Sequence, residues 1–380
     1  MRGHGGPDVI LFLHNRYRTT GGEERVVDDL RWLVREHLGE DARLLARDSA
    51  TIGRARAAAG LLGGGLAPER VTSAVRETGA RIVHAHNLNP SLGWRALAAA
   101  RAGGARTVLH LHNYRLVCAV GTCFTRGADC TRCHGRDTLP GVRLNCRGTG
   151  AEAAVYGASL ALWQRRLVEH ADAVVVPSRA ALARLRALDA PLDGAAVHVV
   201  GHTLRAFAAA STAAAGEHAL VVSRLAPEKG VDVAIAACAA AGLPLVIAGD
   251  GPQRAALEAR AAGTRTTFKG RVDASELARL RTAAGLAIVP SRSAETFGLA
   301  AAEAMAAGLP VVASAIGALP ELCDPAALVA PGDAAALALA ARARFGDAVA
   351  GEAGRRRIID LAAPATVAAA LREVYDSVLR

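Results

Sequence analysis

Apolar and polar positions alternate along the first 200 residues in the manner of strands followed by helices. The apolar run 9–14 leads into residues 21–38, where valine and leucine recur at three- and four-residue intervals, as on one face of a helix. Further apolar runs, separated by helix-forming stretches, predict strands at 81–86, 106–112, 173–178 and 196–200. This alternation is typical of a doubly wound α/β domain with a parallel sheet.

A second series of the same kind begins after residue 217, and residues 201–217 show no strand pattern. Its apolar runs predict strands at 219–225, 243–251, 266–272, 285–291, 309–314 and 326–332. We therefore expect two facing Rossmann-like domains, 1–201 and 202–364, with a ligand cleft beyond the carboxyl ends of their strands. A C-terminal helix, 365–380, could pack back on either domain, and the N-terminal domain is the expected one.

Composition agrees with two packed domains. The chain has 380 residues, a length that exceeds what one hydrophobic core usually serves. Of these residues 52% are hydrophobic and 21% are charged, which argues against a disordered protein. No uncharged apolar run reaches 18 residues, and the short apolar N-terminal stretch lacks a small-residue cleavage site after it. We expect a soluble, cytoplasmic protein.

Positive charge is concentrated in the first domain. The net charge is +10, and residues 1–200 hold 27 arginines against 18 acidic residues, so this half carries an excess of nine charges. No helix-turn-helix, zinc-finger or ribonucleoprotein pattern accompanies it, which argues against a nucleic-acid partner. An anionic membrane surface or a phosphorylated substrate is favoured, with a merely solvated arginine-rich surface as the alternative.

Lys229 stands out because the chain has two lysines and 43 arginines. Alone it would be read as a surface charge, but Arg224 lies five residues before it, just after a predicted strand. Arginine offers a planar fork for two oxygens and lysine a compact charge, so the two together suit a diphosphate. Gly21 and Gly22 open the first predicted helix, where backbone N–H groups could meet a phosphate, although a glycine pair is also typical of a plain turn.

Two glutamates accompany a short predicted helix near residue 300. Glu295 lies in the loop before it, and Glu303 lies in its second turn. Carboxylates close to the positive end of a helix can accept hydrogen bonds from sugar hydroxyls, while the backbone N–H groups of Phe297, Gly298 and Leu299 can face phosphate or sugar. Alone, Glu303 would be read as an ordinary exposed helix residue.

Five motifs in order carry a family resemblance: VSRLAPEKG, GDGP, FKG, the segment PS…ETFGL…EAMAAGLPVVAS, and GALPEL. They resemble the donor domain of the family-4 retaining glycosyltransferases of GT-B fold, whose double-glutamate motif matches Glu295 and Glu303. GGEERVV and VHAHN resemble the N-terminal signatures of the family, so the resemblance covers nearly the whole chain. One departure lies at the interdomain link, where VVGHTLRAF replaces a frequent Asn-Gly pair.

The resemblance implies roles for individual residues. Arg224 and Lys229 would clamp the donor diphosphate, and Gly22 would approach it from the opposite domain. Glu303 would hold the ribose hydroxyls, and Glu295 the donor sugar. Lysine at position 229 would then be required because it neutralises the leaving diphosphate at short range.

Further roles follow from the same resemblance. The backbone of residues 297–299 would also hold the donor sugar, and the nucleobase would pack near Arg271 and Val272. His112 matches the active-site histidine that contacts the donor sugar, whereas His110 is interpreted as a core or capping histidine. Retention in the family is usually explained by front-face attack, in which a donor phosphate oxygen takes the acceptor proton. No protein nucleophile and no catalytic metal ion are then needed.

A cysteine-bearing insertion, residues 118–146, holds five of the seven cysteines. Cys118, Cys130, Cys133 and Cys146 have a spacing compatible with a structural zinc site, and reduced thiols without metal are an equal alternative. The CTRCH segment also fits a haem-attachment pattern, which the lack of an export signal disfavours. A similar insertion occurs in a branch of family-4 enzymes, and we expect it to shape the binding of the acceptor.

The resulting functional hypothesis is a retaining hexosyltransferase. It would use a nucleotide-sugar co-substrate, UDP-sugar being favoured over GDP-sugar on family frequency alone, and need no other cofactor for catalysis. The hydroxyl acceptor would be lipid-linked, a polysaccharide intermediate or a small secondary metabolite, with peripheral association at an anionic inner membrane face for the first two. The alternatives are a nucleotide-sugar epimerase of the same fold and a non-catalytic, metal-dependent binding module.

Overall fold

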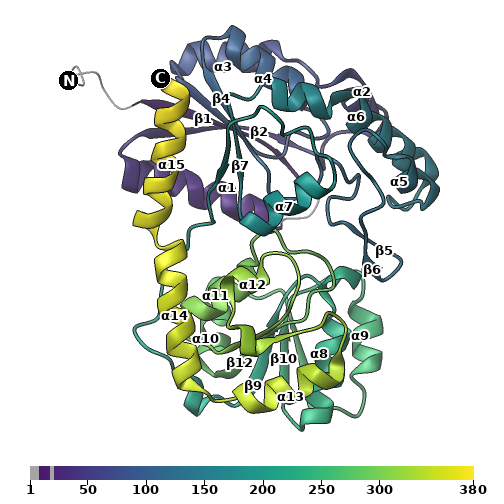
Figure 1. Cartoon of the computed structure of the whole chain (residues 1–380), viewed down its shortest axis with the longest axis vertical. Helices are drawn as coiled ribbons and strands as arrows, with labels where there is room; N and C mark the ends of the chain where they lie inside the picture. Colours follow the sequence, from purple (N-terminus) through teal and green to yellow (C-terminus); the bar gives the residue numbers. More distant parts are fainter. Residues whose placement is uncertain (1–7, 18–20) are drawn as a thin grey trace. The chain divides into compact units, whose positions relative to one another are not determined.

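The computed structural model describes residues 8–17 and 21–380, which form two compact units (Figure 1). Unit 1 comprises the chain up to Cys123, Thr131–Thr203 and Pro364–Arg380, and unit 2 comprises Phe124–Cys130 and Leu204–Ala363. The N-terminal stretch inspected for a leader lies partly outside the described residues. No helix among the described residues is long and apolar enough to cross a membrane.

Unit 1 is built on a six-stranded parallel sheet. Its strands, in spatial order, are β2 (Asp41–Asp48), β1 (Val9–Arg16), β3 (Ile82–Ala85), β4 (Arg106–His110), β7 (Ala173–Val176) and β8 (Val197–Val199). Strands β3 and β7 are buried along their length, as expected where helices cover both faces, and β7 is entirely apolar whereas β3 carries His84. The strand order reverses between β1 and β3, and their carboxyl ends meet there.

Amphipathic helices flank this sheet (Figure 1). They are α1 (Gly22–Leu33), α2 (Arg54–Gly63), α3 (Glu69–Thr78), α4 (Gly93–Ala102), α6 (Gly150–Glu169), α7 (Arg179–Ala187) and α15 (Pro364–Leu379). The helix expected over 21–38 continues from α1 into a π-helical turn, η1 (Val34–Leu38), which Gly39 ends with φ +72°. The C-terminal helix α15 belongs to unit 1, where it contacts η1 and β4.

The insertion contains little regular structure. β5 (Phe124–Thr125) and β6 (Ala128–Asp129) form a small antiparallel hairpin, and α5 (Leu139–Arg143) is a single turn and a half of helix packed on α6. Cys133 lies against this turn, since a Cβ added to Gly141 would be 3.5 Å from its Sγ.

Unit 2 is built on a second six-stranded parallel sheet. Its spatial order is β11 (Thr266–Gly270), β10 (Leu245–Ala248), β9 (His218–Val222), β12 (Ala284–Val289), β13 (Val311–Ser314) and β14 (Leu328–Val329). The order reverses between β9 and β12, so the loops that follow Val222 and Val289 lie side by side although they are far apart in sequence.

Short, alanine-rich helices cover the second sheet. They are α8 (Val231–Ala241), α9 (Arg254–Arg260), α10 (Ala274–Thr282), α11 (Leu299–Ala306), α12 (Leu319–Leu322), α13 (Ala334–Arg344) and α14 (Ala348–Ala362), with 3₁₀ turns η2 (Ala213–Ala215), η3 (Pro227–Lys229) and η4 (Pro325–Ala327). Many of their alanines are buried against the strands. Small side chains therefore bring helix and sheet backbones close together in this core.

Most of the predicted strands are present but shorter than expected, such as Leu245–Ala248 within 243–251 and Leu328–Val329 within 326–332. The strand expected over 106–112 ends at His110, so His112 lies in the loop that follows β4. The edge strand β2 was not predicted, because its burial is irregular and four of its eight residues are charged.

Candidate active site

The strand-order reversal of unit 2 brings the predicted donor residues onto neighbouring loops. Arg224 and Lys229 follow β9, and Glu295 follows β12. In open parallel sheets the loops beyond the carboxyl ends at such a reversal form the usual ligand site. The fold therefore places the motifs that contain Arg224, Lys229 and Glu295 on adjacent loops at one edge of the sheet.

Glycines allow these loops to approach one another. Gly249, after β10, has φ +145°, and a Cβ there would lie 1.8 Å from the carbonyl oxygen of Ser223. Gly317, after β13, has φ +58°, and a Cβ there would lie 2.4 Å from the backbone nitrogen of Glu295. Neighbouring Ala318 donates its N–H to the carbonyl oxygen of Glu295 at 2.8 Å. Side chains at either glycine would separate the loops.

Lys229 and Glu295 form an ion pair. Lys229 Nζ lies 2.7 Å from Glu295 Oε1, and the Ser291 hydroxyl donates to the same oxygen at 2.6 Å. The two side chains are 28% and 18% exposed, so the pair is largely shielded yet reachable. Burial raises the pKa of Glu295, but the charge and hydrogen bond of Lys229 and the bond from Ser291 outweigh it and lower this pKa below its usual value. Glu295 is therefore an ionised acceptor at neutral pH.

Arg224 is held from one side by Glu228. Its guanidinium pairs with the buried Glu228 carboxylate one helical turn along the chain, while the Arg224 side chain remains 57% exposed. The remaining N–H groups of the fork are thus available to a ligand. The i, i+4 spacing of Arg224 and Glu228 in VSRLAPEKG could have predicted this ion pair from the sequence.

Glu303 lies in α11 and pairs with Arg281 of α10. Both side chains are mostly buried, at 10% and 15% exposure respectively. Arg281 was missed at the sequence level because it lies 22 residues from Glu303 on a different helix, and no local spacing connects them. The ion pair fixes the Glu303 carboxylate before any ligand arrives.

The remaining predicted donor residues occupy different positions. The Phe297 side chain is 5% exposed within the core, so only its backbone could serve a ligand. Gly298 has φ +92° and caps α11, which begins at Leu299. Arg271 is exposed directly after β11, whereas Val272 packs partly against the core.

In unit 1, Gly21 and Gly22 form the exposed N-terminus of α1, as expected. The Glu24 carboxylate accepts hydrogen bonds from the backbone N–H groups of Gly21, at 2.8 Å, and Tyr17, at 2.9 Å. Burial raises the pKa of Glu24, and bonds from His14, Tyr17 and Gly21 together lower it to about 2. An ionised carboxylate therefore links Tyr17, just after β1, to the first residues of α1.

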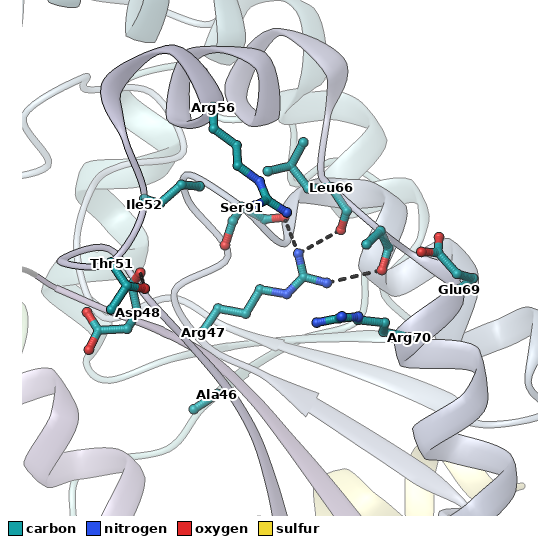
Figure 2. Close-up of a pocket in the computed structure, with 11 residues that line it drawn as sticks. Ala46, Arg47, Asp48, Thr51, Ile52, Arg56, Leu66, Glu69, Arg70 and Ser91 are labelled. Carbon is teal, nitrogen blue, oxygen red and sulfur yellow. Dashed lines mark hydrogen bonds between the residues drawn. The ribbon is translucent and has the colours of Figure 1, made fainter.

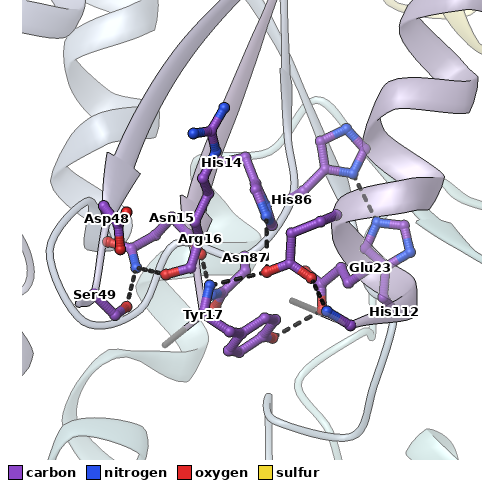
Figure 3. Close-up of polar contacts among 12 residues, drawn as sticks. His14, Asn15, Arg16, Tyr17, Glu23, Asp48, Ser49, His86, Asn87 and His112 are labelled. Atoms are coloured by element: carbon purple, nitrogen blue, oxygen red, sulfur yellow. Dashed lines mark hydrogen bonds and ion pairs between the residues drawn. The ribbon is translucent and has the colours of Figure 1, made fainter. Parts of the chain in front are cut away.

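A partly buried polar cluster lies beside that helix end (Figure 3). The Tyr17 hydroxyl donates to Glu23 Oε2 at 2.8 Å and accepts from Arg115 at 2.9 Å, while Asn113 Nδ2 donates to Glu23 at 3.2 Å. Burial, and then the Glu23 charge, raise the pKa of Tyr17 above its usual range, so the phenol stays neutral. Asn113 and Arg115 belong to the HNYR segment, which the cluster anchors to α1.

His112 contacts this region from the loop after β4. Its Nε2 lies 2.7 Å from His86 Nδ1 (Figure 3). Burial, and then the neighbouring His14, lower the pKa of His112 to about 3, so its ring is neutral at pH 7 and can both donate and accept a hydrogen bond. His110 is 1% exposed, which agrees with its interpretation as a core histidine.

The insertion pairs two cysteines that the predicted zinc set separates. Cys118 and Cys123 are joined by a side-chain hydrogen bond, although Cys123 was left out of the set of Cys118, Cys130, Cys133 and Cys146. Among the described residues, the groups of three nitrogen, oxygen or sulfur atoms that converge closely enough to bind metal contain histidines and no cysteine. The four-cysteine zinc site stays a prediction.

A basic pocket of about 440 Å³ lies beyond the carboxyl end of β2 (Figure 2). The Arg47 guanidinium donates to the carbonyl oxygens of Leu66 and Ala67 at 2.8 and 3.0 Å, which fixes it in the wall. Burial, and then the charge of Arg70, lower the pKa of Arg47. Arg56 and Arg70 are exposed and line the pocket together with Asp48 and Glu69, so three arginines face two carboxylates and the pocket carries a net positive charge.

Comparison with known proteins assigns this architecture to a family. Residues 2–203 match the family described as "Glycosyl transferase 4-like domain", and residues 216–347 match "Glycosyl transferases group 1". The first match alone covers more than half of the chain. The protein therefore belongs to the family-4 glycosyltransferases, and its two parallel-sheet units form a GT-B fold.

Two relatives illustrate the similarity in sequence. The chain is 40% identical over 172 residues to "Glycogen synthase" of Mycobacterium tuberculosis, which is 41% of each chain. It is 39% identical over 132 residues to "2-deoxystreptamine glucosyltransferase" of Streptomyces kanamyceticus, covering 31% of this chain and 33% of that one. The alignments thus span about two fifths or less of the length of these relatives.

Solved structures agree on the fold. Sucrose-phosphate synthase of Thermosynechococcus elongatus superposes with a TM-score of 0.72 at 20% identity, covering 98% of this chain and 99% of that chain. The Anabaena protein Alr3699/HepE, solved in complex with UDP and glucose, superposes with a TM-score of 0.66 at 17% identity, covering 97% and 100%.

Proposed function

We propose that this protein is a retaining glycosyltransferase that moves a sugar from a nucleotide-sugar, with UDP-sugar favoured, to a hydroxyl acceptor. The observation that carries the proposal is the shielded Lys229–Glu295 pair at the strand-order reversal of unit 2, with the exposed fork of Arg224 on the same loop. It combines two cations for a diphosphate with one ionised acceptor for sugar hydroxyls. The names of the aligned relatives support the same class of activity.

In the proposed reaction, the bond between the anomeric carbon and the diphosphate oxygen breaks while the acceptor oxygen attacks from the same face. Arg224 and Lys229 stabilise the negative charge that develops on the diphosphate. A diphosphate oxygen takes the acceptor proton, so charge and protons balance without a protein nucleophile. Glu295 and the backbone around Gly298 orient the sugar. The neutral His112 ring suits hydrogen bonding to a sugar hydroxyl.

The basic pocket of unit 1 supports an acceptor that carries a phosphate or carboxylate group. Arg56 and Arg70 provide charge at the rim, and the fixed Arg47 closes the wall (Figure 2). For such an acceptor, Arg70→Ala should raise KM several-fold and leave kcat unchanged, because the residue would contribute binding and no chemistry. Anionic vesicles in the same assay would show whether the acceptor is lipid-linked.

Calorimetry with UDP, GDP and ADP tests the donor assignment. We expect one nucleotide to bind, and Glu303→Ala to weaken it at least about tenfold, since the carboxylate would hold ribose hydroxyls. Glu352→Ala in α14 removes a glutamate that pairs with Arg355 and should leave binding unchanged. A folded protein that binds none of the three nucleotides would overturn the proposal.

Product analysis separates the two alternatives. A retaining transferase gives a glycoside with the anomeric configuration of the donor, visible by NMR, and only when an acceptor is present. An epimerase would convert the donor without acceptor. A binding module would bind nucleotide with no turnover for any acceptor.

A further inference from the structure

Five of the twelve histidines gather in unit 1, four of them stacked and His202 tilted against His110 and His112. Neighbouring ring centroids lie 4.1–5.5 Å apart for most pairs, and the cluster consists of His84, His86, His110, His112 and His202. Strand register creates it: His84 of β3 lies opposite Val108 of β4, so two residues further His86 falls beside His110. The proposed transfer reaction uses only His112.

Three of these rings are buried and neutral. His84, His86 and His110 are 0%, 3% and 1% exposed. Burial, and then the neighbouring histidines, lower the pKa of each, well below its usual value for His86 and His110. A neutral imidazole has one nitrogen lone pair, and this is the form in which histidine binds metal ions.

The ring nitrogens converge. One nitrogen from each of His84, His86 and His110 lies within 4.8 Å of the other two. His84 Nε2 and His110 Nδ1 are 3.3 Å apart, which is long for a hydrogen bond. Two nitrogens bound to one tetrahedral zinc ion at 2.0–2.1 Å lie about 3.3–3.4 Å apart. The distance between His84 Nε2 and His110 Nδ1 therefore matches that of two ligands on a shared ion.

Surrounding groups orient two of the rings. The Tyr375 hydroxyl lies 2.7 Å from His84 Nδ1, which directs His84 Nε2 toward the cluster. His112 engages His86 Nδ1 at 2.7 Å, which leaves His86 Nε2, a buried nitrogen with no hydrogen-bond partner among the described residues. Buried polar atoms without partners are rare, and metal-bound histidines usually donate their second nitrogen to such an outer group.

We propose that unit 1 binds one divalent late transition-metal ion, with Zn²⁺ the best match, through His84, His86 and His110. Tyr375 is a positioning residue that links the site to α15. A metal ion at His86 Nε2 leaves the His86 proton on Nδ1, which then donates it to His112 Nε2. Because His112 Nε2 accepts this bond, the proton of the His112 ring lies on its Nδ1. The ion would therefore fix the tautomer of His112 as well as join strand ends to the C-terminal helix.

Cobalt substitution tests the site on the full-length protein. Purified protein should retain about one Zn²⁺ per chain by elemental analysis, and Co²⁺ should replace it with visible bands of a nitrogen-ligated, four-coordinate ion. The insertion cysteines could also bind zinc, so the same measurements are made with Cys118, Cys130, Cys133 and Cys146 all replaced by serine. We expect this variant to keep the metal, with no thiolate charge-transfer band.

Matched histidine variants locate the ion. His84→Gln should lower Co²⁺ affinity at least about 100-fold, and Tyr375→Phe, which keeps the packing, about 10- to 100-fold. His202→Gln removes a neighbour from a second convergent group, His110, His112 and His202, and should leave affinity unchanged. If His84→Gln does not fold, Tyr375→Phe against His202→Gln gives the same comparison.

Three results would overturn the proposal. They are wild-type protein that binds neither Zn²⁺ nor Co²⁺ at micromolar concentrations, metal that disappears with the cysteines, and metal that depends on His202 instead of His84 and Tyr375. Nitrogen-15 NMR of histidine gives an independent readout, because Zn²⁺ should shift the His112 signals to those of a ring protonated on Nδ1.

Discussion

Lys229 Nζ lies 2.7 Å from Glu295 Oε1, so two residues that sequence motifs assign to different parts of the donor form one ion pair. The compact ammonium can contact this carboxylate and still approach a diphosphate, whereas a guanidinium needs more room and a fixed plane. The pair gives a structural reason for a lysine in a chain with 43 arginines.

Replacing Lys229 should therefore impair turnover whether the substitution removes the positive charge or keeps it. We expect Lys229→Met to lower kcat about 10²–10³-fold, as when one stabilising donor is removed, and Lys229→Arg to lower it despite the retained charge. Steady-state kinetics at saturating donor measures both. The other lysine, exposed Lys269 in β11, provides the control: Lys269→Arg should match wild type. Full turnover in Lys229→Arg would contradict the short-range role.

Glu24 should make stability pH-dependent. Its pKa falls from 4.5 to about 2 on folding, so its stabilising contribution is complete above pH 4.5 and disappears as the pH falls toward 2. Glu24→Gln should lower the free energy of unfolding at pH 7 by at most about 3 kcal/mol. Urea denaturation from pH 7 to pH 3 should show the difference from wild type narrowing below pH 4.5. Exposed Glu36→Gln should change stability little.

Gly249 should tolerate no side chain. Gly249→Ala places a Cβ 1.8 Å from the Ser223 carbonyl oxygen at φ +145°, whereas Gly263, at φ +78°, has no atom within 4 Å of the corresponding position. We expect Gly263→Ala to cost about 1 kcal/mol for backbone strain and Gly249→Ala about 3 kcal/mol or more. Chemical denaturation measures both. Equal losses would mean that the loops do not approach as closely as described.

Cys118 should be the most reactive thiol of the insertion. The hydrogen bond from Cys123 outweighs burial and lowers the Cys118 pKa to about 6, so the thiolate predominates at pH 7. Mass spectrometry after brief alkylation should find Cys118 modified first, with a rate that rises through pH 6 and levels off above it. Cys123→Ala should slow the reaction, since the thiolate loses its donor. Alkylation of Cys118 no faster than that of Cys130 would refute the pairing.

The sequence by itself determined the two-unit α/β architecture and most strands, because buried parallel strands leave apolar runs that need no tertiary information. It also indicated Arg224, Lys229, Glu295 and Glu303, since these lie in motifs at strand ends. It failed at β2, an edge strand with scattered charges, and at His112, where the apolar run continues past the last ladder bond of β4.

Only the tertiary structure decided which distant residues meet. The pairing of Arg281 with Glu303 depends on how α10 and α11 pack, and the convergence of His84, His86 and His110 depends on the register between β3 and β4. A His-x-His spacing shows that two rings share one face of a strand, but a shift of register by one residue would turn the neighbouring ring away. Contacts between elements are set by packing, which local patterns do not encode.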